Sequence, residues 1–139
     1  MAQPDNTAFK PEIALEFINN YNSYSDDSLH EQKDLDKWLM NNPILTDRFK
    51  SIYKKTIDDA YKAEPEVGLD FDPIINGQYS PPKGLKILKF DSTKGYVQLC
   101  GKEEKDFTIM VKLVFQKHIW MIDGAGIINI PKSMQRKPK

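Results

Sequence analysis

Residues 107–115 read Phe107-Thr108-Ile109-Met110-Val111-Lys112-Leu113-Val114-Phe115, and this stretch decides the fold class. Its odd positions are all apolar, whereas its even positions include Thr108 and Lys112. This period-two alternation predicts a β-strand with one face buried and the other at least partly in contact with water. The surrounding stretch of residues 85–123 carries no convincing catalytic motif.

Three further segments around this strand have the same character. We expect strands over residues 85–90, 95–100 and 119–123, joined by short turns into a four-stranded antiparallel meander. Gly124-Ala125-Gly126 follows the last strand and allows a bulge or bend. Residues 68–84 link the sheet to the preceding helices and are too irregular for a central strand. Long ordered connections of this kind tend to carry function.

The first half of the chain predicts three helices. Pro11 suits a first helical position, and an apolar stripe follows it: Ile13, Ala14, Phe17, Ile18 and Tyr21. A short second helix is expected over residues 34–40, and it stops before Pro43. Thr46 is a good N-cap for the third helix, whose apolar stripe includes Phe49, Ile52, Tyr53, Ile57 and Tyr61. The predicted fold class is therefore α+β, with N-terminal helices packed on a curved four-stranded antiparallel meander.

The length of 139 residues suits one domain. We expect a disordered lead-in over residues 1–10, a single α+β domain over residues 11–131 and a basic flexible tail over residues 132–139. The polar, turn-prone start of the chain is typical of a mature protein after signal-peptide removal, although a native cytosolic start fits these residues almost as well.

The composition excludes several classes of protein. Twenty basic residues balance twenty acidic ones, so the overall basic excess of a nucleic-acid binder is absent. The single cysteine, Cys100, cannot form an internal disulfide or a cysteine-cluster metal site. No apolar run approaches the roughly 20 residues that span a membrane. We therefore expect no nucleic acid, no cofactor and no integral membrane segment.

Four pieces of the chain carry a resemblance to a known family: Asn42-Pro43-Ile44-Leu45-Thr46 with Phe49, Asp70-x-Asp72-Pro73-Ile74, Gln78, and Trp120-x-Ile122-Asp123. With three helices before a meander, they resemble the cystatin-like or nuclear-transport-factor-two-like α+β roll. Within it the chain is similar to the bacterial family called domain of unknown function 3828. The resemblance implies small, commonly exported proteins and no established reaction. Tyr79 after Gln78 departs from the acidic residue often found there, which makes a metal or proton-transfer role at this corner less expected.

Asp70-Phe71-Asp72 is the first candidate site. Two carboxylates at this spacing can chelate a hard cation such as calcium, or share a proton where they converge. A calcium loop would supply more oxygen ligands nearby, and Pro73-Ile74-Ile75 supplies none. The ordinary alternative, which the sequence favours, is that one Asp caps a turn and the other faces water. We predict no metal site and no catalytic residue.

Other candidates lie in loops or at strand ends. Gln78 and Tyr79 form a corner where a tyrosine can anchor a partner. Asp123 ends the last strand and is expected to accept hydrogen bonds from backbone amides at the glycine bend. His118 falls in a hairpin turn and His30 in an acidic loop, and a dyad of His118 with Asp123 is only weakly supported.

We therefore expect a non-enzymatic exported or periplasmic domain that binds a protein or small ligand on the concave face of its sheet. The predicted contact residues are Asp70, Asp72, Gln78, Tyr79 and Asp123. A second hypothesis is an inhibitor or immunity protein that blocks a partner enzyme such as a cell-wall hydrolase toxin. A third, less favoured, is a hydratase or isomerase that uses Asp70, Asp72 or Asp123.

Overall fold

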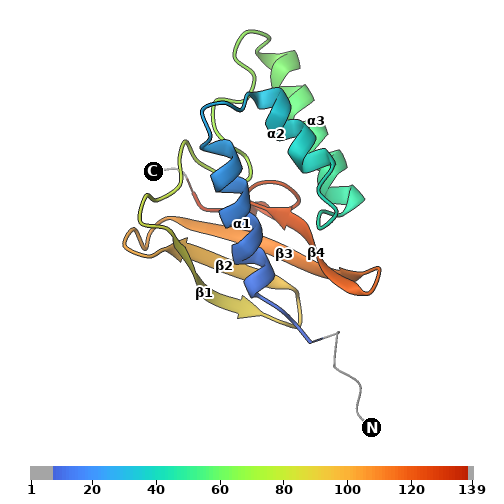
Figure 1. Cartoon of the computed structure of the whole chain (residues 1–139), viewed down its shortest axis with the longest axis vertical. Coiled ribbons are helices and arrows are strands. Elements are labelled where there is room, and N and C mark those ends of the chain that lie inside the picture. The colour runs from blue at the N-terminus through green and yellow to red at the C-terminus, as the bar shows by residue number, and fades with distance from the viewer. Residues whose placement is uncertain (1–7, 138–139) are drawn as a thin grey trace.

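The computed structural model describes residues 8–137 and is an α+β fold, as predicted. Three helices lie on one face of a four-stranded antiparallel sheet: α1 (Glu12–Ser25), α2 (Gln32–Met40) and α3 (Asp47–Ala63). Figure 1 shows α1 lying across the sheet, whereas α2 and α3 lie side by side on the β4 side, where α3 contacts β4. The cystatin-like subtype remains a prediction.

The sheet is a meander of β1 (Leu85–Asp91), β2 (Tyr96–Gly101), β3 (Thr108–Gln116) and β4 (Ile119–Ala125), paired in that order. Its central strand follows the predicted alternation, because Ile109, Val111 and Leu113 are buried and the residues between them are partly exposed. The predicted bulge near the glycine bend is present as a register shift between β3 and β4 at Lys112 and Leu113.

The helices follow from their apolar stripes. The buried side chains of α1 are Ala14, Phe17, Ile18 and Tyr21. The predicted N-cap of α3 is present, since Thr46 Oγ1 accepts the backbone N–H of Phe49 at 3.0 Å. These stripes and the facing side chains of the sheet form one hydrophobic cluster, which fills the space between the two layers.

The segment of residues 64–84 connects α3 to β1, and it is held by the core and by the residues that follow β4. Ile74 and Ile75 are buried in the core, and the N–H of Ile127 donates to the carbonyl of Pro73 at 2.9 Å. Gly126 has a φ of 64°, and a Cβ there would collide with the carbonyls of Pro73 and Ile74. This close approach holds the candidate segment in one position.

Both ends of the described chain are more ordered than the sequence suggested. Phe9, within the expected disordered lead-in, packs edge-on against Trp120 with ring centroids 5.1 Å apart. Within the expected flexible tail, residues Lys132–Met134 form a 3₁₀ helix (η1). Arg136 follows it and lies over the Phe107 ring, 4.2 Å from the centroid. Each end therefore packs against an aromatic ring of the domain, Trp120 or Phe107, and composition alone does not predict such a contact. Residues 1–7 and 138–139 of these two predictions lie outside the described residues.

Candidate functional site

A cleft of about 300 Å³ opens where the three helices meet the segment of residues 64–84. We call it the helix-end cleft. Its lining residues come from α1, α2, α3 and that segment: Tyr21, Gln32, Leu35, Tyr53, Ile57, Tyr61, Leu69, Asp70, Phe71, Asp72, Pro73 and Gln78. Three of the five predicted contact residues, Asp70, Asp72 and Gln78, therefore share one site.

The pair of Tyr21 and Asp72 forms the floor of the cleft. Tyr21 occupies the last buried position of the α1 stripe, where its ring belongs to the core and its hydroxyl reaches outward. That hydroxyl donates to Asp72 Oδ2 at 2.7 Å, and the N–H of Ile74 donates to Asp72 Oδ1 at 2.9 Å. Asp72 thus caps the turn that follows it, the ordinary role for one of the two Asp residues.

A second tyrosine–carboxylate pair lies beside the first. Tyr53 as a whole is 2% exposed, and its hydroxyl donates to Asp36 Oδ1 at 2.9 Å. The side-chain amide of Gln32 donates to the same carboxylate oxygen at 3.0 Å and to the Tyr53 hydroxyl at 3.3 Å. These contacts tie α2 to α3 and hold the Tyr53 phenol and the Gln32 amide at the wall of the cleft, with Asp36 behind them.

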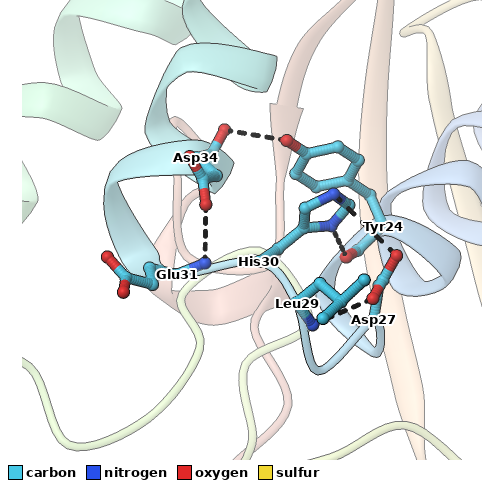
Figure 2. A network of polar contacts seen from close by, with 6 residues as sticks. All are labelled: Tyr24, Asp27, Leu29, His30, Glu31 and Asp34. Atoms are coloured by element: carbon cyan, nitrogen blue, oxygen red, sulfur yellow. Dashed lines mark hydrogen bonds and ion pairs between the residues drawn. The ribbon is translucent and has the colours of Figure 1, made fainter.

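A network at the turn between α1 and α2 holds the second pair in place (Figure 2). His30 stacks on the Tyr24 ring with centroids 3.7 Å apart, and His30 Nδ1 lies 2.8 Å from the Tyr24 carbonyl oxygen. Asp34 Oδ2 accepts the N–H of Glu31 at 2.9 Å, which caps the first turn of α2. His30 therefore organises a helix connection, and α2 carries Gln32, Leu35 and Asp36 toward the cleft.

Burial shapes the acid–base properties of the cleft. Burial raises the pKa of Asp72 above its usual value, and the hydrogen bonds from Tyr21 and Ile74 oppose this rise. Burial, and after it the charge of Asp72, raises the pKa of the Tyr21 phenol far above its usual range. Burial and then Asp36 do the same to the pKa of Tyr53. Both phenols stay protonated at neutral pH and act as hydrogen-bond donors.

The exposed part of the cleft comes from the segment of residues 64–84. Asp70 faces water, and its carbonyl accepts a hydrogen bond from the side-chain amide of Gln78. The backbones of Asp72 and Gly77 pair in both directions, which closes the tight loop between them. Asp70 and Gln78 are thereby held at the mouth, while Asp72 lies deeper. Among residues 8–137, no group of three or more His, Cys, Asp or Glu side chains is arranged to hold a metal ion.

The other two predicted contact residues lie elsewhere. Tyr79 is 71% exposed and lines a neighbouring hollow with the acidic hairpin of residues 103–106. Asp123 is buried, and the prediction that it binds backbone amides at the glycine bend is wrong. It accepts hydrogen bonds from the side chains of Thr46, at 2.7 Å, and Asn129, at 3.1 Å. The side chain points toward the N-terminus of α3 instead of the bend, so it joins that helix to β4.

His118 also has no place in the cleft. It is exposed in the two-residue turn between β3 and β4, where Lys117 and His118 both have positive φ values, 54° and 65°. A dyad with the buried Asp123 is not formed, because Asp123 accepts hydrogen bonds from Thr46 and Asn129.

A larger and more open hollow, of about 550 Å³, lies on the face of the sheet opposite the helices. Gln98 and Met110 pair across it, each one residue from the core positions Leu99 and Ile109. Lys89 pairs with Gln98, because a register shift separates it from Ile87, which faces the core. Its polar side chains lie on an open sheet surface, as expected for the wet face of a meander. The helix-end cleft differs because it withdraws a carboxylate from water, and we therefore place the candidate site there.

Three residues that line the cleft, Tyr21, Tyr53 and Gln32, were not predicted as site residues. Both tyrosines were assigned to the core, and their rings do lie in it. The available signal was the choice of Tyr over Phe at a buried stripe position, because a buried phenol needs a hydrogen-bond partner.

The chain matches no protein-family model, no curated protein and no solved structure in the comparisons. The resemblance to domain of unknown function 3828 therefore stays a prediction. Within residues 8–137, no helix combines the length and apolarity needed to cross a membrane.

Proposed function

We propose that the protein is a non-enzymatic binding domain, exported or periplasmic, whose ligand occupies the helix-end cleft. The observation that carries the proposal is Asp72, a carboxylate withdrawn from water that still lines an open cleft. Its oxygens accept hydrogen bonds from the Tyr21 hydroxyl and from the backbone N–H groups of Ile74 and Ile75, whereas an ionised carboxylate has about four acceptor positions. The remaining capacity is available to a ligand.

The shape of the cleft supports a small ligand. Its volume of about 300 Å³ lies at the lower end of the usual range for small-molecule sites. Its walls combine apolar side chains such as Leu35, Ile57 and Leu69 with a few polar groups that converge on one point. This combination is typical of a specific binding site.

The raised pKa of Asp72 is also the feature expected of a general base, so the enzyme hypothesis needs a physical answer. The hydrogen bonds from Tyr21 and Ile74 oppose the rise in the pKa of Asp72, which weakens Asp72 as a base and still leaves acceptor positions open. The phenols of Tyr21 and Tyr53 are held protonated and donate to Asp72 and Asp36, so they do not accept protons from a ligand. This arrangement favours binding over proton transfer.

The proposal is tested by closing the cleft and following what the protein retains. Leu69→Trp fills the cleft, whereas Val67→Trp adds the same side chain two residues away at a position that is 60% exposed. Wild type and both variants are incubated with a small-molecule extract of the source cells and analysed by native mass spectrometry. We expect a ligand on the wild type and on Val67→Trp, and none on Leu69→Trp. Equal retention by all three proteins would overturn the proposal.

The inhibitor or immunity function is the second candidate, and one observation favours it. Tyr79 is 71% exposed beside Glu103, Glu104 and Asp106, which presents an aromatic anchor on an acidic corner. In that case a single protein partner is captured from an envelope extract and Tyr79→Ala abolishes the capture. Leu69→Trp would then leave it unchanged, which separates the two functions.

Support for an exported location is limited to the family resemblance. Fractionation of the source cells tests it directly: the protein should be found in the periplasmic or secreted fraction, and a purely cytoplasmic location would refute it.

A further inference from the structure

The charged residues that line the helix-end cleft indicate which class of ligand it can bind. Two of its twelve lining residues are carboxylates, Asp70 and Asp72, and none of those within residues 8–137 is Lys, Arg or His. Arg136 and Lys137 line an adjoining hollow, which shares Asp70, Phe71 and Gln78 with the cleft. The Arg136 guanidinium is engaged there by the Asn76 carbonyl and the Phe107 ring. The charged side chains that line the cleft within residues 8–137 are therefore all negative, so the electrostatic potential of the lining favours a cation.

Within residues 8–137, Asp72 forms no salt bridge with a positively charged side chain. Its protein donors are all neutral: the hydroxyl of Tyr21 and the backbone N–H groups of Ile74 and Ile75. A partly buried carboxylate without a cation has an unfavourable free energy of desolvation, and burial accordingly raises its pKa. A positively charged ligand would supply the missing charge at the point where acceptor capacity remains.

Two aromatic residues of the segment and of α3, Phe71 and Tyr61, also line the cleft. Tyr61 is 46% exposed and its ring lies directly against the backbone of Gly68, so close that a Cβ there would be 2.6 Å from Cε1. Phe71 lines the cleft between the two carboxylates in sequence. The faces of such rings attract organic cations by about 0.5–2 kcal/mol each, depending on solvent exposure. Rings instead of further oxygen ligands favour an organic cation over a metal ion.

We propose that the ligand of the helix-end cleft is a small organic cation, an alkylamine or a quaternary ammonium compound. Its charged group lies at Asp72 and its alkyl groups contact Tyr61 and Phe71. This inference rests on the proposed binding function and adds the chemical class of the ligand.

The test compares a cation with a neutral molecule of the same shape. Choline and its neutral isostere 3,3-dimethyl-1-butanol are titrated into ¹⁵N-labelled protein, and backbone amide shifts are followed in NMR spectra. We expect choline to shift the amides of Asp72, Ile74 and Gln78 in a saturable manner. The isostere should bind at least tenfold more weakly. Butylamine extends the test to primary amines.

Three variants locate the interaction. Asp72→Asn removes the central charge, and Tyr61→Leu removes the aromatic face at a half-exposed position that tolerates change. Both should weaken choline binding at least fivefold. Asp58→Asn, which removes an exposed acid from the same helix as Tyr61, should leave it unchanged. If Asp72→Asn does not fold, Asp70→Asn and Tyr61→Leu still decide the result, because both side chains are exposed.

The outcomes separate this inference from the proposed function. Equal binding of choline and its isostere at the cleft amides would overturn the organic-cation ligand and leave the cleft as a binding site. The absence of any shift at these amides with choline and butylamine at tens of millimolar would also overturn it. The fate of the broader proposal is then decided by the Leu69→Trp comparison alone.

Discussion

Replacing Tyr21 by Phe tests the floor of the cleft with the removal of one oxygen atom. The ring stays in the core, where Tyr21 is 1% exposed, and only the 2.7 Å hydrogen bond to Asp72 is lost. A hydrogen bond to a charged group contributes about 1.5–3 kcal/mol to stability, and a neutral one about 0.5–1.5 kcal/mol. The size of the loss therefore depends on whether Asp72 is ionised.

The direction of the pH dependence follows from linkage. Burial raises the pKa of Asp72 in the folded state, so the folded protein holds a proton that the unfolded chain, with a pKa of about 3.9, has already released. Stability therefore falls as the pH rises from that value to the raised native pKa. The Tyr21 hydroxyl opposes the rise. Without this hydroxyl the native pKa of Asp72 is higher still, so the stability of the variant falls over a wider pH range than that of the wild type. The destabilisation by Tyr21→Phe must therefore grow with pH.

Urea unfolding, followed by the fluorescence of Trp38 and Trp120, measures the effect. We expect Tyr21→Phe to lower the free energy of unfolding by about 1 kcal/mol near pH 4 and by about 2 kcal/mol near pH 8. In an Asp72→Asn background the increase with pH should disappear. Tyr53→Phe is the matched control for size. The loss of unfolding free energy caused by Tyr53→Phe should stay near 1 kcal/mol at both pH values, because Asp36 keeps the hydrogen bond from Gln32. A Tyr21→Phe effect that is constant or falls with pH would refute the assigned role of Asp72.

Two further predictions concern the scaffold that positions the cleft. Thr46→Val removes the N-cap of α3 and the hydroxyl donor of the buried Asp123, so the free energy of unfolding should fall by about 2–4 kcal/mol in urea titrations. Thr46→Ser should cost about 1 kcal/mol, and equal losses for both variants would contradict the hydroxyl's role. Gly126→Ala adds a Cβ at a φ of 64° against the carbonyl of Pro73, and the melting temperature should fall sharply. An unchanged melting temperature would show that this close approach is absent.

The fold class could be predicted because its determinants are local. The alternation of residues 107–115 and the stripe after Pro11 are visible within one turn or one strand length. Thr46 could be identified as an N-cap for the same reason, since its partner Phe49 lies three residues away. The predicted helices and strands then allow few ways to bury their apolar faces, and helices packed on one face of a meander is among them.

The candidate site could be predicted only where it is continuous in sequence. Asp70, Asp72 and Gln78 share one loop and were selected together. The two tyrosines that complete the cleft come from different helices, and Tyr21 is separated from Asp72 by 51 residues. The direction of a phenol depends on packing that no local pattern contains. The ordered ends were missed for the same reason, because Phe9 and Arg136 are held by rings far away in sequence.

Asp72 and Asp123 show why burial alone does not identify a site. Asp123 is 4% exposed, and its two oxygens accept the Thr46 hydroxyl and the Asn129 amide, so its remaining acceptor positions are enclosed by the core. Asp72 accepts hydrogen bonds from one phenol and from the backbone N–H groups of Ile74 and Ile75, and it still borders an open cleft. A carboxylate with unused acceptors at a surface is free to exchange water for a ligand, whereas one enclosed by its own partners stabilises the fold. Asp72 is therefore assigned to ligand binding because a ligand can reach its free acceptor positions. Asp123 is assigned to stabilising the fold because a ligand cannot reach its own.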